Sequence, residues 1–123
     1  MPYVAPNNMI GEFTVNVALS TTSATSLLSN AASSGRVLKV ISIVAANVEG
    51  TNAADITVSR FSAAALGGTA FPMASTISVP ADASLIVADA TTPVVLAADT
   101  SLGATAGTAN AITMTVTYQE LAG

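Results

Sequence analysis

The feature that most constrains this fold is a strict two-residue alternation of side-chain types near both ends of the sequence. Phe13, Val15, Val17 and Leu19 alternate with polar or small residues, and apolar residues alternate with threonine over 112–118. Successive side chains of a β-strand point to opposite faces of a sheet. Both segments are therefore predicted to be strands with an apolar inner face and a polar outer face.

Short apolar segments separated by turn signals fill the region between these two strands. Residues 36–48 are apolar on both faces, which predicts a central strand covered on both sides. Shorter strands are expected in segments bounded by Gly, Pro, Asp or Asn: 25–28, 53–61, 71–79, 85–87 and 94–96. No segment has the spacing of a convincing amphipathic helix. The sequence predicts an all-β fold, an antiparallel two-sheet sandwich or jelly-roll-like domain of about eight short strands.

Residues 1–9 depart from this pattern because Pro2 and Pro6 block regular strand pairing. We interpret them as an extended N-terminal arm, followed by a single β-sandwich domain over 10–123, a length that suits one hydrophobic core. The arm is either a loose terminus or a segment that lies on a neighbouring subunit. In the second case, partner contacts would come from Pro2, Tyr3, Val4, Pro6, Asn7 and Asn8.

The composition excludes several functional classes. Cysteine and histidine are absent, which removes disulfides, thiolate zinc sites, thiol nucleophiles and the usual general base near neutral pH. Three basic residues cannot neutralise a phosphate backbone or favour an anionic membrane, so neither nucleic acid nor a membrane is an expected partner. The first residues show no basic and apolar secretory signal. We expect no enzyme activity, no cofactor and no metal.

Acidic residues gather in the second half of the sequence, where residues 61–123 contain four acids and no base. Asp82, Asp89 and Asp99 fall in predicted turns, where aspartate commonly accepts hydrogen bonds from nearby backbone N–H groups. The alternatives are a Ca²⁺ site or an acidic rim that faces a basic partner. A calcium loop needs closely spaced oxygen ligands, and these three aspartates are too far apart in sequence for one.

A carbohydrate-binding module is a second functional class that fits a β-sandwich. Sugar sites use aromatic side chains as platforms, and this sequence has five aromatic residues: Tyr3, Phe13, Phe61, Phe71 and Tyr118. We expect Phe13 and Tyr118 to face inward, which leaves few for a sugar.

The low charge favours a structural role. Charged residues make up 8 % of the sequence, far below the roughly 25 % of an average soluble domain. Natural edge strands commonly use charges, lysine above all, to prevent pairing with other molecules, and few charges are present here. Thr, Ser and Asn cover the predicted polar faces instead. We therefore interpret the protein as a subunit that works while packed against partners.

The segments that follow resemble small virion structural proteins of tailed bacteriophages. The likeness lies in strand and turn patterns over 37–58, 77–87, 93–96 and 99–106, and in the closing Tyr-Gln-Glu of 118–120. It departs from the pattern over 88–92, where related chains often have a basic residue and this one has none.

The resemblance implies a capsid decoration (cement) protein, which would bind the major capsid protein on the outside of the head and associate with its own copies, often as a trimer. A neck or tail component of the virion is the alternative, and a host-binding adhesin is the third. Besides the arm, residues 21–34 and 63–70 are expected contact regions, the latter containing a flexible Gly67-Gly68 turn.

Overall fold

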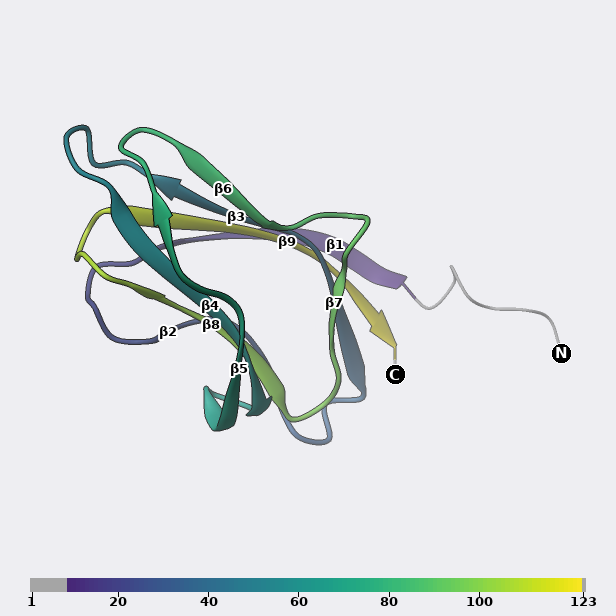
Figure 1. The fold of residues 1–123 in the computed structure, drawn as a ribbon. Coiled ribbons are helices and arrows are strands. Elements are labelled where there is room, and N and C mark those ends of the chain that lie inside the picture. The colour runs from purple at the N-terminus through teal and green to yellow at the C-terminus, as the bar shows by residue number, and fades with distance from the viewer. Residues whose placement is uncertain (1–8, 123) are drawn as a thin grey trace, which may run out of the picture.

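The computed structural model describes residues 9–122, which form nine β-strands in two antiparallel sheets and contain no helix (Figure 1). The expected all-β, two-sheet architecture is thus confirmed. Because residues 9–122 lack helices, none of them forms a helix able to cross a membrane. In chain order the strands are β1 (Met9–Ala18), β2 (Thr25–Asn30), β3 (Arg36–Asn47), β4 (Ala54–Ala63), β5 (Gly67–Val79), β6 (Ser84–Ala88), β7 (Val94–Leu96), β8 (Thr100–Ala106) and β9 (Ile112–Ala122).

The chain passes back and forth between the two sheets. The first sheet has the order β1-β9-β3-β6, with β7 also pairing with β3, and the second has the order β2-β8-β4-β5. The first and last strands are therefore neighbours, although they are the most distant in sequence. Five strands lie at sheet edges: β1 and β2 at one side of the sandwich, and β5, β6 and β7 at the other.

The two alternating segments pair with each other, as β1 and β9. Val15 lies opposite Val116 and Val17 lies opposite Met114, so the apolar faces coincide and point into the core. Strand β1 begins at Met9, one residue inside the range expected for the arm.

The expectation that Phe13 is turned inward is only half correct. Its ring belongs to the inner face and packs against Tyr118, with ring centroids 5.6 Å apart. It nevertheless stays 44 % exposed, because β1 is an edge strand and no other strand within residues 9–122 pairs with its outer side. The ring lies over Gly11, where a Cβ atom would come within 2.7 Å of it.

The predicted central strand is β3, which pairs with β9 on one side and with β6 and β7 on the other. Its inward side chains Val40, Ile43 and Ala45 are fully buried. The opposite face, with Val44 and Ala46, is half-buried in the isolated chain. One irregularity in the β3–β9 register, between Val40 and Ser42, keeps apolar side chains directed into the core on both sides of it.

Candidate interaction surfaces

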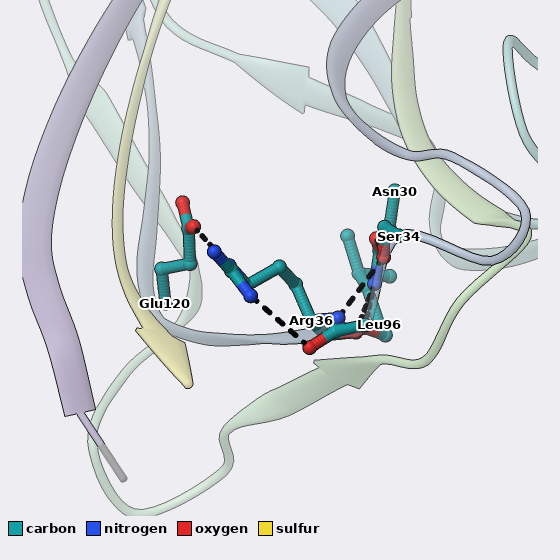
Figure 2. A network of polar contacts seen from close by, with 6 residues as sticks. Asn30, Ser34, Arg36, Leu96 and Glu120 are labelled. Carbon is teal, nitrogen blue, oxygen red and sulfur yellow. Dashed lines mark hydrogen bonds and ion pairs between the residues drawn. The ribbon is translucent and has the colours of Figure 1, made fainter. Parts of the chain in front are cut away.

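Asn30 is a buried polar residue that joins the two sheets at one end of the sandwich (Figure 2). It is the last residue of β2, in the second sheet, and is 3 % exposed. Its Nδ2 donates to the backbone carbonyls of Arg36 (2.9 Å) and Leu96 (3.0 Å), both in the first sheet. Ser34 Oγ donates to its Oδ1 at 2.5 Å. Nearby, Arg36 Nε forms an exposed ion pair with Glu120 at 3.0 Å, a type that adds little stability.

Asn47 is a second buried asparagine that joins the two sheets, here through β3 and β5. It is the last residue of β3 and is 2 % exposed. Its Nδ2 donates to the carbonyl of Val79 (2.9 Å), at the end of β5 in the other sheet, and to that of Asn52 (3.0 Å). Its Oδ1 accepts from the N–H of Glu49 at 2.9 Å. Both buried asparagines thus have fully used amides, and each fixes one sheet to the other.

Asn30 and Asn47 stabilise the contact between the two sheets, and sequence reasoning did not identify either residue. The available signal was the position of each Asn at the end of an apolar segment, shortly before a turn. Within residues 9–122, every buried side-chain nitrogen or oxygen has a hydrogen-bond partner.

The turn expected within 63–70 is present, but it does not lie at Gly67-Gly68. Both glycines belong to the start of β5, and the turn lies at Ala64, Ala65 and Leu66. Ala65 (φ 57°) and Leu66 (φ 59°) adopt the left-handed conformation, which costs a non-glycine residue roughly 1–2 kcal/mol. The sequence signal for this turn was misleading because glycine usually occupies such positions.

Hydrogen bonds from neighbouring strands hold this turn in place. Ser101 Oγ donates to the carbonyl of Ala63 (2.7 Å) and accepts from the N–H of Leu66 (2.9 Å). Asp99 Oδ1 accepts from the N–H of Ala64 at 3.1 Å. The side chain of Leu66 lies over Gly103 of β8, so the turn forms a fixed cap on the second sheet.

The other expected contact regions have different outcomes. Residues 1–8, which include Pro2, Tyr3, Val4, Pro6, Asn7 and Asn8, lie outside the described residues. Within 21–34, the strand expected at 25–28 is β2, which continues to Asn30, and its Leu27 and Leu28 are buried in the core. Exposed residues of this region therefore lie mainly on either side of β2.

The carboxylates of Asp89, Asp99 and Glu49 accept hydrogen bonds from their own turn or from nearby backbone. Asp89 Oδ1 accepts from the N–H (2.9 Å) and hydroxyl (2.5 Å) of Thr91, and these bonds lower the pKa of Asp89 below its ordinary value. Glu49 accepts from the N–H groups of Thr51 (2.7 Å) and Asn52, which lower its pKa in the same way. No three His, Cys, Asp or Glu side chains in residues 9–122 lie close enough together to hold a metal ion.

Exposed apolar side chains gather on the edge strands. Residues 9–122 have nine large exposed apolar side chains, and eight of them belong to β1, β5, β6 or β7: Met9, Ile10, Phe13, Phe71, Met73, Ile77, Ile86 and Val95. Glu12, in β1, is the single charged residue in the five edge strands. The edges of this sandwich are therefore apolar and nearly uncharged, which is unusual for strands that face water.

Within residues 9–122, the two most exposed aromatic residues lie on different edges of the sandwich. Phe13 lies on the β1 edge and Phe71 (50 % exposed) lies on the β5 edge, at the opposite side of the sandwich. The guanidinium of Arg60 lies 5.5 Å from the centre of the Phe71 ring. Phe71 therefore lies apart from the rings of Phe13 and Tyr118, which pack against each other.

Comparison with known proteins identifies a likeness of fold. No family model matches the sequence. No curated protein matches it either. A solved structure from Bacillus endospore appendages, which form a novel family of disulfide-linked pili, is similar with a TM-score of 0.52 and 15 % identity. The similarity covers 91 % of this chain and 85 % of that one, so it extends over nearly the whole sandwich.

Proposed function

We propose that this protein is a non-enzymatic structural subunit that works packed against other protein chains, and that its assembly is a bacteriophage virion. Its role there would be that of a capsid decoration protein, bound on the outside of the head and bridging major capsid subunits. The observation that carries the proposal is the concentration of exposed apolar side chains on almost uncharged strand edges. The resemblance over 37–58 and 77–87 supports the choice of a virion.

The physical properties of the sandwich suit such a role. A surface with few charges loses little hydration free energy when a partner covers it. The buried amides of Asn30 and Asn47 and the fixed cap at 64–66 hold the body in one conformation, so binding would order few further groups. A standard interface of about 1,200–2,000 Å² per contact, repeated over many copies, would then resist the separation of capsid subunits.

A subunit of a filamentous appendage is the second candidate, and the likeness to the endospore appendage protein favours it. The pili of those appendages are disulfide-linked, whereas the 123 residues of this sequence contain no cysteine. A filament built from these residues could therefore not be linked by disulfides. A neck or tail position remains the alternative within the virion.

Antibody labelling of particles and filaments from cells that produce the protein tests these proposals. Label over phage heads is the expected result. Label on a neck or tail ring would instead identify the protein as a component of that part of the virion. Label along filaments would replace the virion proposal with the appendage. A glycan array with tight binding by the isolated protein would instead favour an adhesin.

A truncation of residues 1–8 tests the arm. The truncated protein is expected to keep its circular dichroism spectrum and unfolding midpoint, because β1 begins at Met9. Its attachment to undecorated heads, measured as bound copies per head, is expected to fall. Full attachment by the truncated protein would refute a contact role for Pro2, Tyr3 and the other arm residues.

A further inference from the structure

The edge strands of this sandwich differ in how well they are protected against pairing with another chain. Natural edges are protected by proline, by β-bulges, by short length or by charges. Strand β5 has Pro72 in its middle and three irregularities in its register with β4. Strand β2 has six residues and an irregularity between Ser26 and Leu28, and β6 and β7 have five and three residues.

Strand β1 has almost none of these protections. It is ten residues long, contains no proline and no basic residue, and pairs with β9 in unbroken register from Gly11 to Ala18. On its outer face, side chains of β1 and β9 are joined by hydrogen bonds: between the hydroxyls of Thr14 and Thr117 (3.1 Å), from Thr115 Oγ1 to Asn16 Oδ1 (2.9 Å), and from Gln119 Nε2 to the Glu12 carboxylate (3.2 Å). Among the strands that the structure describes, none pairs with this outer edge, which is long and regular enough to accept another strand.

We propose that β1 is the site of self-association, and that it pairs antiparallel with β1 of a second copy so that the first sheets of two sandwiches become continuous. The strand is complementary to itself about Val15. In that register Phe13 lies opposite Val17 of the second copy, an aromatic and β-branched pair of the kind that stabilises sheets. Thr14 lies opposite Asn16 of the second copy, and Val15 lies opposite its equivalent.

Charge and exposure both favour a second copy as the occupant. The protein carries a net charge of −4, which opposes association in general. In this register, however, the single charge of the strand, Glu12, lies opposite Ala18 of the second copy, so no like charges face each other. The pairing also covers the exposed ring of Phe13 and the half-buried Val15 and Val17. Because the interface uses the same strand from both chains, it closes at two copies and gives a dimer, in place of the trimer that the resemblance implies.

The test is the mass of the 123-residue protein in solution, measured by analytical ultracentrifugation from about 1 to about 100 µM, where weak interfaces dissociate. A species of twice the 12.1 kDa chain mass is expected for the unaltered protein. The double variant T14K/N16K places lysines opposite lysines and is expected to weaken dimerisation by about tenfold or more. The matched control T69K/S75K puts two lysines on the exposed β5 edge and is expected to dimerise normally.

Charge reversal distinguishes pairing at β1 from a loss of folding. T14E/N16E is also expected to be monomeric alone, and an equimolar mixture with T14K/N16K is expected to restore a dimer. A monomer at every concentration, a trimer, or a dimer that survives T14K/N16K would overturn the proposal. If T69K/S75K loses the dimer while T14K/N16K keeps it, the interface lies at β5. The dimer does not depend on attachment to a virion. If no dimer forms, the proposed function is unaffected, and if the protein is not part of a virion, the proposed dimer is unaffected.

Discussion

Replacement of Asn47 by alanine tests whether buried amides hold the two sheets together. The substitution removes two donors and one acceptor, and with them the bonds to Val79, Asn52 and Glu49. Three hydrogen bonds at about 1 kcal/mol each give about 3 kcal/mol. The carbonyl of Val79, a residue that is 1 % exposed, loses its side-chain donor, and this adds about 1 kcal/mol.

The expected loss of about 3–4 kcal/mol is a large part of the roughly 5–15 kcal/mol that stabilises a typical domain. Urea denaturation followed by circular dichroism measures it, with an expected fall in midpoint of about 2 M. Asn52→Ala is the matched control, because Asn52 contributes its backbone carbonyl to Asn47 and keeps it in the variant. An N47A midpoint equal to that of N52A would refute the reasoning.

A second substitution at the same position separates hydrogen bonding from packing. N47D preserves the shape of the side chain but presents a carboxylate to the carbonyls of Val79 and Asn52. This environment raises the pKa of the new carboxyl above its unfolded value, so the variant should be least stable at neutral pH. Its deficit relative to the unaltered protein should shrink as the pH falls toward the ordinary carboxyl range of about 4.

Three further predictions concern the cap on the second sheet and the acidic turns. Gly103→Ala places a Cβ 2.6 Å from Leu66 Cδ2, and the overpacking should lower the free energy of unfolding by about 1–3 kcal/mol in urea titration; an unchanged midpoint would contradict the cap. Ser101→Ala removes both bonds to the turn, so the Leu66 amide should exchange with deuterium faster while amides of the β1–β9 pair keep their rates. Asp89 has a lowered pKa, so its stabilising effect is present at neutral pH and is lost as the pH falls through that pKa; the difference in urea midpoint between the unaltered protein and D89N should vanish in acid, and a constant difference would contradict it.

The elements that could be predicted from sequence are those whose burial follows a simple period. The alternation in 112–118 located β9, and the doubly apolar segment 36–48 located β3 as the central strand within one residue at each end. Sequence reasoning ended β9 too early, at Tyr118, because Glu120 interrupts the apolar face. The strand continues to Ala122 because β1 and β3 supply backbone partners on both sides.

The features that sequence reasoning missed depend on contacts between distant segments. Asn30 and Asn47 look like turn formers, and nothing local shows that the carbonyls of Leu96 and Val79 will face them. The left-handed conformation of Ala65 is likewise stabilised from outside the turn, where Ser29 Oγ accepts from its N–H at 2.9 Å. The sequence showed that the protein has few charges, but it did not show which strands carry the interaction surface. The edge strands follow from the order of strands in each sheet, which depends on pairing between distant segments.

The pairing of the first and last strands determines how the sandwich would respond to a mechanical load. Met9 lies opposite Leu121, so the beginning of β1 and the end of β9 are at the same end of the molecule (Figure 1). Ladder hydrogen bonds run perpendicular to antiparallel strands, and a pull on these two positions would load them one after another, as in a zipper. Tension applied there would peel β1 away at low force. An assembly under strain would therefore be stronger if the load crossed the faces and edges of the sandwich rather than its two ends.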